Sequence, residues 1–296
     1  MTVADRLLVL GAGTMGSQIA QQAALGGANV LLVDTARAQL QRAVASNRTY
    51  LERRVDKGRL DADAAVTALA RVVISDDLSA AAESDWAIEA IVEDVDAKRA
   101  AFRDLDRVLP AHAGIASNSS NIVISRVADV TGRPELCCNM HFFHPVLMME
   151  ICEVGRGPAT SDETVDRAIT WCRWMNRRPV LVEREVDGFI VNRILGAASR
   201  EAFSLLADDI ASVADIDEGA RSGLNWPLGP FQLADFSGLD VVLGVRRDRA
   251  LRDHQPGDEA AVTILQRLVD AGRLGRKSGC GFYDYTSLPP VSVALP

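Results

Sequence analysis

Short apolar runs alternate with longer amphipathic stretches through the first 185 residues. The runs at residues 7–10 and 30–33 have the length and continuity of strands that are buried on both faces of a parallel sheet. Between them, apolar residues from Met15 to Ala24 recur at helical spacing. Further strands are predicted at 72–75, 86–92, 114–117, 136–143, 148–154 and 180–183, and further helices at 36–57, 61–70, 96–109 and 160–175. This alternation predicts an α/β fold with a doubly wound, mostly parallel sheet.

The pattern changes near residue 185. A long apolar-striped helix is predicted over 189–207, and no β-rich run follows until the C-terminal end. A chain of 296 residues is long for a single core, so we predict two domains. Residues 1–185 would form the sheet with its helices, and residues 186–296 an all-helical domain. Thr160 and Glu163 predict a capping box for the helix at 160–175, and a loose tail is predicted over 287–296.

The first predicted turn carries the pattern G-x-G-x-x-G. Residues 11–16 read GAGTMG, directly after a strand and at the start of a helix, and Asp34 ends the next strand. In this context Gly11 permits the tight turn, Gly13 lets a pyrophosphate approach the backbone, and Gly16 lets helix and strand pack closely. Free N–H groups at the start of the helix favour phosphate. The motif therefore predicts a Rossmann-type dinucleotide site, and the alternative is a plain strand, turn and helix.

Asp34 indicates NAD rather than NADP. Its carboxylate can accept hydrogen bonds from both ribose hydroxyl groups, and its charge would repel a 2′-phosphate. Arg37 is the one nearby feature that would favour the phosphorylated cofactor.

The composition is that of an ordinary globular protein, with 48% hydrophobic and 24% charged residues. A formal net charge of -8 argues against nucleic acid or an anionic membrane as the main partner. No apolar run approaches the length of a membrane span, and the first strand begins too early to leave room for a signal peptide. The five cysteines lack C-x-x-C spacing, which indicates reduced, mostly buried thiols in a cytoplasmic protein and no metal site.

Three groups of polar residues have two interpretations each. The basic residues of the helix at 36–57 form either a solvated face or a cationic edge that receives the phosphates of a bulky substrate; they are Arg42, Arg48, Arg53, Arg54 and Lys57. Glu89 and Glu93 lie near the carboxyl end of a predicted strand, where ligands of such sheets bind, although exposed loop carboxylates are common. Residues 118–121, Asn-Ser-Ser-Asn, suit either a ligand or a helix cap.

His141 and Glu153 lie on two β-rich runs that flank a turn at His144-Pro145. If the runs fold back on each other about Leu147, the two side chains lie opposite each other. A carboxylate that fixes the tautomer of a histidine and stabilises the imidazolium gives a general base. From the spacing alone, a structural ion pair is the other interpretation.

Several motifs, in order along nearly the whole chain, resemble the L-3-hydroxyacyl-CoA dehydrogenase family, whose short members include 3-hydroxybutyryl-CoA dehydrogenases. The motifs are GAGTMG, EAIVED, ASNSSNI, HFFHP, EICEV, DGFIVNR, NWPLGPFQLADFSGLD and LGRKSGCGFYDY. Several motifs in the right order are far more specific than any one of them.

The resemblance implies NAD-dependent oxidation of the 3-hydroxyl group of a short-chain L-3-hydroxyacyl-CoA to the 3-ketoacyl-CoA, and the reverse. By resemblance, His141 takes the hydroxyl proton, Glu153 orients His141, and Ser120 and Asn192 hold the substrate oxygen. The residues that bind NAD would be Gly11, Gly13, Thr14, Met15, Gly16, Asp34, Glu93, Lys98, Asn118, Ser120, His144 and Lys277. The partners implied are an acyl thioester substrate and a second copy of the chain, joined through the C-terminal domain.

The chain departs from the family pattern at three positions. His144 replaces a usual asparagine, Glu150 a usual lysine, and Asp187 a usual proline. The changes at residues 144 and 150 motivate a second hypothesis: the same chemistry on a related hydroxy acid or on a hydroxyacyl group bound to a carrier protein.

A third hypothesis is a non-catalytic NAD-binding protein on the same scaffold. It predicts a damaged catalytic set, whereas His141, Glu153 and Asn192 are all present.

Overall fold

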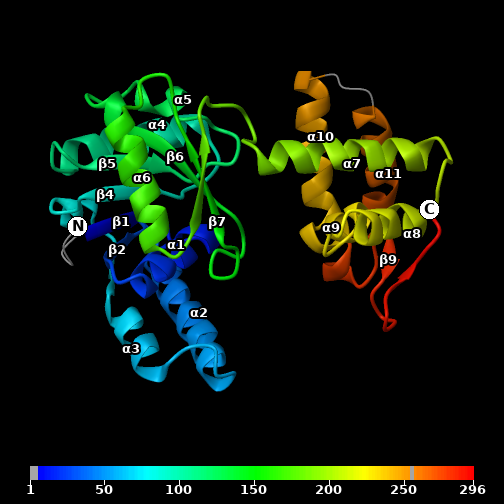
Figure 1. Ribbon diagram of the computed structural model, residues 1–296, viewed down its shortest axis with the longest axis horizontal. Coiled ribbons are helices and arrows are strands. Elements are labelled where there is room, and N and C mark those ends of the chain that lie inside the picture. Colours follow the sequence, from blue (N-terminus) through cyan, green and yellow to red (C-terminus); the bar gives the residue numbers. More distant parts are fainter. Residues whose placement is uncertain (1–5, 254–256) are drawn as a thin grey trace. The chain divides into compact units, whose positions relative to one another are not determined.

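Eight strands form one sheet in the N-terminal part of the chain (Figure 1), in the order β3-β2-β1-β4-β5-β6-β7-β8. The structure is a computed structural model that describes residues 6–253 and 257–296. Neighbouring strands run parallel, except that β6 and β7 are antiparallel. The strands are β1 (Arg6–Leu10), β2 (Asn29–Val33), β3 (Val72–Ser75), β4 (Trp86–Glu89), β5 (Gly114–Ser117), β6 (Cys137–Phe142), β7 (Ile151–Gly155) and β8 (Arg178–Val182). The predicted doubly wound, mostly parallel sheet is confirmed.

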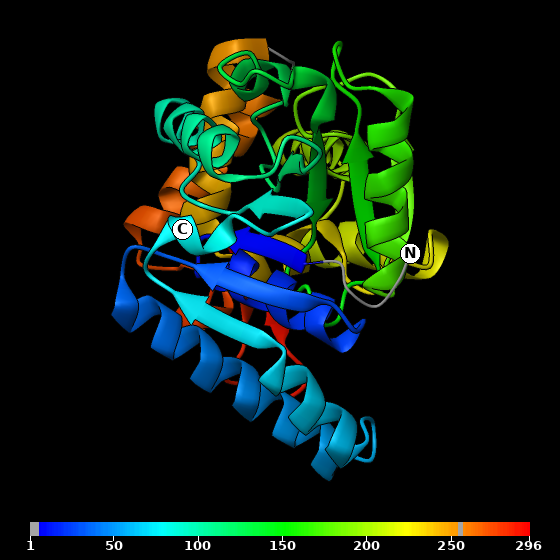
Figure 2. The same cartoon turned by 90° about the vertical axis from the view of Figure 1, so that its left-hand side faces the viewer.

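Helices cover both faces of this sheet, so its strands are apolar on both sides. Alternate residues of β1 enter two separate cores: Leu7 and Val9 pack on one face, and Leu8 packs on the other. The helices here are α1 (Thr14–Leu25), α2 (Arg37–Asp56), α3 (Ala62–Ala70), α4 (Val95–Val108), α5 (Ser125–Ala128) and α6 (Asp162–Trp174), with 3₁₀ turns η1 (Leu78–Ala81) and η2 (Pro134–Leu136). Figure 2 shows α2 and α3 side by side next to β3, at one edge of the sheet.

The strand order reverses between β1 and β4. From β1 the chain builds outward through β2 and β3, and then returns to place β4 on the other side of β1. Gly11 follows β1 and Ala90 follows β4 at the same edge of the sheet. In doubly wound sheets, ligands bind in the crevice at such a reversal.

The antiparallel pair β6 and β7 brings His141 opposite Glu153, because the register pairs these two residues directly. The predicted fold-back of the two β-rich runs is therefore confirmed. Since β6 is parallel to β5, His141 lies near the carboxyl edge of the sheet, the edge that also carries the glycine loop.

The predicted capping box at the start of α6 is wrong. Ser161 is the N-cap residue, and its hydroxyl accepts a hydrogen bond from the backbone N–H of Thr164 at 3.2 Å. Thr160 is engaged elsewhere: its hydroxyl donates to the carbonyl oxygen of Cys137 at 2.6 Å and accepts from the N–H of Gly157 at 3.0 Å. Either hydroxyl could cap the helix, and the contact with β6 decides between them.

Several predicted boundaries also differ, among them the start of β7, which lies at Ile151 rather than at residue 148. Strand β4 ends at Glu89 rather than at residue 92, because the N–H of Ile91 turns back to the Glu89 carboxylate at 2.7 Å. Helix α7 begins at Val191 rather than at residue 189, since Phe189 has a positive φ of 46°. Part of the predicted loose tail is ordered, because β10 (Val291–Ser292) pairs with β9 (Tyr283–Asp284).

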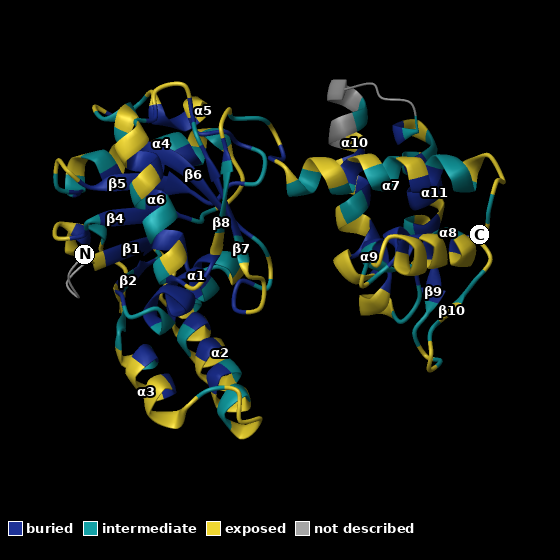
Figure 3. Cartoon of the chain, in the orientation of Figure 1, coloured by how far each residue is buried: buried dark blue, intermediate teal, exposed yellow. Residues whose placement is uncertain are grey.

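The chain divides into two compact units, Met1–Ile190 and Val191–Pro296, whereas the sequence predicts a boundary near residue 185. The second unit is helical apart from β9 and β10, in agreement with the predicted class. Its helices are α7 (Val191–Ala207), α8 (Val213–Glu218), α9 (Pro230–Ser237), α10 (Leu239–Asp253) and α11 (Asp258–Asp270), with turns η3 (Gly219–Gly223) and η4 (Arg276–Ser278). Phe203, Phe231 and Phe282 form its centre, with ring centroids 4.7 to 5.9 Å apart. Figure 3 shows the buried residues of each unit in dark blue.

All five cysteines are free; four are buried and Cys280 is partly exposed. Burial raises the pKa of Cys137 to about 12, and it also raises the pKa of Cys138 and Cys152. The predicted burial of most thiols is confirmed. Within the described ranges, no cluster of three or more potential ligands could hold a metal ion. No helix there combines the length and apolar character needed to cross a membrane.

Candidate active site

The carboxyl ends of β1, β2 and β4 surround a cavity of about 520 Å³. Its lining consists of Leu10, Gly11, Gly13, Thr14, Met15, Asp34, Thr35, Gln39, Ala90, Ile91 and Val92. The structure thus brings together five of the residues that the sequence predicts to bind the cofactor. The cavity combines the glycine loop, the start of α1 and an acidic residue, which are the elements that a dinucleotide requires.

The glycines of the loop fit this purpose. Gly11 has a φ of 104°, and a Cβ atom there would lie 2.6 Å from the carbonyl oxygen of Ala90. A side chain at Gly16 would collide with the carbonyl oxygen of Gly11, so α1 packs closely on the loop. A Cβ atom at Gly13 would meet nothing within 4 Å, which leaves space for phosphate groups against the backbone.

Asp34 is fixed at the end of β2. Its two carboxylate oxygens accept hydrogen bonds from the backbone N–H groups of Ala12 and Ala36, each at 2.8 Å. The carboxylate therefore faces the glycine loop, and its remaining lone pairs can accept from ribose hydroxyl groups. Arg37, which would favour NADP, is exposed and lies 3.6 Å from the carboxylate of Asp76. This arrangement suits a ribose without a 2′-phosphate.

Ser120, His141 and Glu153 form a hydrogen-bonded line. The Nδ1 atom of His141 lies 2.8 Å from Glu153 Oε2, and its Nε2 atom lies 2.9 Å from Ser120 Oγ. Glu153 has no exposed surface and His141 is 3% exposed. The backbone N–H of Ile190 donates to the other oxygen of Glu153 at 3.0 Å. With Nδ1 donating to the carboxylate, Nε2 is free to accept a proton.

Aromatic rings enclose His141 on two sides. The ring centroids of Phe143 and Phe189 lie 4.5 Å and 5.4 Å from that of the imidazole, and Phe189 is stacked on it. Such a line of serine, histidine and carboxylate also serves hydrolases, so the geometry alone specifies proton transfer and not the reaction.

Lys98 and Glu93 lie at the same edge of the sheet. The Lys98 ammonium is 2.6 Å from Glu89 Oε1 and 3.3 Å from Glu93 Oε2. Lys98 is 1% exposed and Glu89 has no exposed surface, whereas the side chain of Glu93 is 41% exposed. Glu89 is absent from the predicted site residues, although a carboxylate inside the apolar run WAIEAIV is a signal of a buried, paired charge.

The remaining predicted residues lie in several places. The Asn118 amide oxygen accepts a hydrogen bond from the N–H of Phe142 at 3.0 Å, which ties the end of β5 to β6. His144 is exposed in the loop between β6 and β7. Asn192 lies in the first turn of α7, and Lys277 in η4 pairs with Asp240 at 2.6 Å; both belong to the second unit.

Glu150, the other departure in this region, is paired with Arg178. Their side chains are 3.2 Å apart on the surface, and the N–H of Arg178 donates to the carbonyl oxygen of Glu150 at 2.6 Å. The charge of Glu150 is therefore balanced by a residue on the adjoining strand β8.

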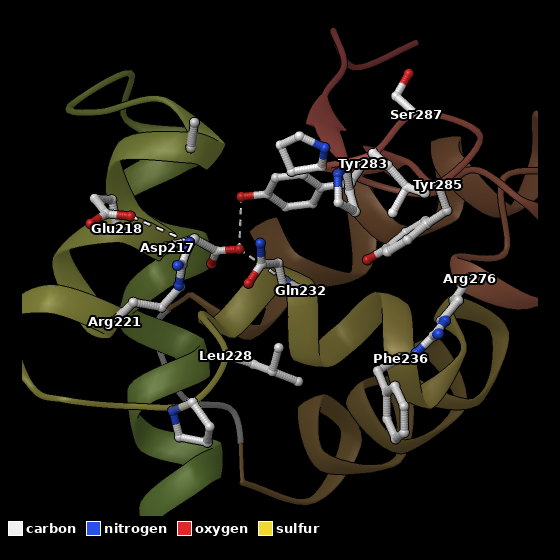
Figure 4. A pocket seen from close by; sticks show the side chains of 15 residues that line it. Asp217, Glu218, Arg221, Leu228, Gln232, Phe236, Arg276, Tyr283, Tyr285 and Ser287 are labelled. Carbon is white, nitrogen blue, oxygen red and sulfur yellow. Dashed lines mark hydrogen bonds and ion pairs between the residues drawn. The ribbon is translucent and has the colours of Figure 1, made fainter.

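The second unit has a cavity of its own, of about 650 Å³ (Figure 4), and none of the predicted site residues lines it. Asp217 lies at its wall and accepts hydrogen bonds from the N–H groups of Phe231 and Gln232 and from the hydroxyl of Tyr283. Burial raises the pKa of Asp217, and these hydrogen bonds oppose the shift. The carboxylate is thus used to join α8, α9 and β9.

Family profiles match both units of the chain. Residues 6–186 match the profile described as 3-hydroxyacyl-CoA dehydrogenase, NAD binding domain. Residues 188–285 match the profile described as 3-hydroxyacyl-CoA dehydrogenase, C-terminal domain.

Individual relatives agree with these matches. The chain is 38% identical over 291 residues to the 3-hydroxybutyryl-CoA dehydrogenase of Bradyrhizobium diazoefficiens, with 98% of each chain covered. It is 35% identical over 287 residues to the 3-hydroxyadipyl-CoA dehydrogenase of Escherichia coli, with 97% of this chain and 60% of that protein covered. The crystal structure of (S)-3-hydroxybutyryl-CoA dehydrogenase from Ralstonia eutropha is similar with a TM-score of 0.88 and 37% identity, covering 96% of this chain and 100% of that chain.

The position of Asp34 predicts the cofactor preference. Asp34→Ala should weaken NADH binding by about 10- to 100-fold, the worth of hydrogen bonds to a charged group, and should reduce the discrimination against NADPH. Fluorescence titration with both dinucleotides measures the two dissociation constants. Asp63→Ala, which removes an exposed carboxylate from α3, is the matched control and should change neither constant. An unchanged NADH to NADPH ratio in Asp34→Ala would remove Asp34 from ribose recognition.

Proposed function

The chain belongs to the 3-hydroxyacyl-CoA dehydrogenase family and is an NAD-dependent dehydrogenase, and from this we propose that it interconverts a short-chain L-3-hydroxyacyl-CoA and its 3-ketoacyl-CoA. The observation that carries the proposal is the line of Ser120, His141 and Glu153 at the sheet edge that also holds the dinucleotide cavity. The names of the Bradyrhizobium and Ralstonia relatives support a four-carbon acyl group.

NAD, when bound, supplies the hydride acceptor for carbon 3 of the substrate. The glycine loop and Asp34 would hold its adenosine and pyrophosphate, since they line the cavity and leave Gly13 open. By family resemblance, Glu93, Lys98, Asn118, His144 and Lys277 would contact the rest of the cofactor.

His141 would act as the general base. The Glu153 carboxylate would accept a hydrogen bond from the Nδ1–H group, so Nε2 would present its lone pair where the Ser120 hydroxyl now lies. In the oxidation, Nε2 would take the proton of the 3-hydroxyl group, and the buried carboxylate would stabilise the imidazolium. In the reduction, the same atom would return the proton. Ser120, together with Asn192 by resemblance, would hold the substrate oxygen as charge develops on it.

A second cavity of the first unit fits the nucleotide part of CoA. It has a volume of about 660 Å³ and lies between the glycine loop and α2. Arg42 and Arg53 line it, together with Ser46 and Tyr50. This favours the cationic edge over the solvated face as the role of α2, because CoA carries several phosphate charges.

The second hypothesis keeps this chemistry on another carrier or acyl group. The similarity to an enzyme named for 3-hydroxyadipyl-CoA leaves the acyl group open. The balanced charge of Glu150 weakens one of the two reasons for this hypothesis.

The predicted homodimer through the second unit is also a proposal here. Phe236, Val241 and Val245 expose 54%, 57% and 44% of their surface on α9 and α10, and such residues suit burial against a second copy.

The direct test is oxidation of NADH with acetoacetyl-CoA, followed at the absorbance of NADH. We expect turnover that is several-fold more efficient than with acetoacetyl-N-acetylcysteamine, which lacks the nucleotide. If neither thioester is turned over at high enzyme concentration, the proposal is wrong.

His141→Ala should lower kcat by about two to four orders of magnitude, the usual contribution of a general base. NADH should still bind, because the histidine lies outside the dinucleotide cavity. His112→Ala is the control, since His112 is exposed and contacts Asp85. A near-normal kcat in His141→Ala would remove this residue from the mechanism.

Arg42→Ala combined with Arg53→Ala should raise the KM for acetoacetyl-CoA by about 3- to 10-fold, as expected for two exposed cations on phosphate. The KM for acetoacetyl-N-acetylcysteamine should stay constant, since that thioester has no phosphate. Arg173→Ala on α6 serves as the control. Equal effects on the two thioesters would count against a CoA site on α2.

A further inference from the structure

Five polar residues at the carboxyl edge of the sheet form a closed ring of contacts, the polar ring, through their side chains and one backbone N–H group. Glu89 Oε1 lies 2.6 Å from Lys98 Nζ, which lies 3.3 Å from Glu93 Oε2. The other oxygen of Glu93 accepts from the hydroxyl of Ser119. The Ser119 N–H donates to Ser117 Oγ at 3.2 Å, and Ser117 Oγ donates to Glu89 Oε2 at 2.7 Å. The ring joins β4, the loop after it, α4 and the segment that follows β5.

The polar ring holds the segment that presents Ser120 to the histidine. The N–H of Asn118 donates to the main-chain oxygen of Glu89 at 2.8 Å. The amide oxygen of Asn118 accepts a hydrogen bond from the N–H of Phe142, and Ser120 Oγ lies 2.9 Å from His141 Nε2. Residues 118–120 are therefore fixed between the ring on one side and β6 on the other.

Glu89 is the buried centre of this arrangement. It has no exposed surface, and its carboxylate accepts three hydrogen bonds, from Lys98, Ser117 and the N–H of Ile91. A buried ion pair is weak evidence for stability, because apolar residues of similar volume often serve as well. The charge of Glu89 is thus better explained by what it positions.

We propose that Glu89 is a positioning residue: through Lys98 it fixes the ammonium group that by family resemblance would contact the cofactor, and through Ser117 it fixes the segment that carries Ser120. The inference rests on the proposed function for the role of Ser120. The expected effect on cofactor binding depends on Lys98 alone.

The test variant is Glu89→Gln, which keeps the side-chain shape and removes the charge that holds the Lys98 ammonium. Lys98 keeps Glu93 as a partner, so we expect the variant to fold, as judged by circular dichroism and thermal unfolding. We expect kcat with acetoacetyl-CoA to fall by about 10- to 100-fold, the cost of a small misplacement near the reacting groups. The dissociation constant of NADH, measured by fluorescence, should rise by about tenfold, as for the loss of one hydrogen bond to a charged group.

Two comparisons separate positioning from general loosening. In a Ser120→Ala background, Glu89→Gln should lower kcat by less than about threefold, because residues that act as one unit are non-additive. Asp106→Asn is the matched control, because it removes a paired carboxylate near the opposite end of α4. There Asp106 Oδ1 accepts a hydrogen bond from Arg133 Nε at 2.7 Å. It should lower the melting temperature and leave kcat and the NADH constant unchanged.

The proposal is overturned if folded Glu89→Gln keeps kcat and the dissociation constant of NADH within about threefold of the wild type. It is also overturned if kcat of the variant with both Glu89→Gln and Ser120→Ala falls by the product of the two single effects. Should Glu89→Gln fail to fold, Ser117→Ala tests the same ring with Glu89 and Lys98 still paired. A fall in kcat of at least about threefold supports the proposal, and an unchanged kcat overturns it. If the wild type turns over no thioester, the proposed function fails alone, and the NADH constant of Glu89→Gln then decides the role of Glu89.

Discussion

The need to pair two fully buried carboxylates, Glu89 and Glu153, constrains the whole carboxyl edge of the sheet. A buried carboxylate without partners costs several kcal/mol. Glu153 is paired with His141 and Glu89 with Lys98, and backbone N–H groups supply further bonds to both. These partners come from separate segments of the chain, so the edge is ordered only when those segments meet. The same contacts place the pair of His141 and Glu153 and the dinucleotide cavity at one edge.

Features that depend on local pattern could be predicted from the sequence. The strands at 72–75 and 114–117 have the predicted bounds. The pairing of His141 with Glu153 follows from alternation along two strands and the length of the turn between them. The glycine loop could be predicted because its glycines stand between a strand and a helix, where Gly11 has a positive φ and Gly16 packs on Gly11. The roles of Ser120 and Asn192 came from family resemblance alone.

Features that depend on distant contacts could not be predicted. Thr160 and Ser161 are equally able to cap α6, and a bond from Thr160 to Cys137, far away in the sequence, leaves the cap to Ser161. The contacts of Glu89 could not be predicted for the same reason, since two of its partners lie nine and 28 residues further along the chain. Sequence shows a carboxylate in an apolar run, and tertiary structure shows what satisfies it.

Although the chain has a net charge of -8, the two cavities of the first unit offer two different kinds of group to an anionic ligand. Among the described residues, no lysine or arginine lines the dinucleotide cavity, so phosphates there would depend on the N–H groups at the start of α1. The cavity beside α2 instead has Arg42 and Arg53, which are exposed side-chain charges. Backbone dipoles act at short range and are shaped to one ligand, whereas exposed charges attract from further away and are screened by salt. The first cavity therefore suits a ligand held in one fixed position, and the second suits a ligand attracted by charge.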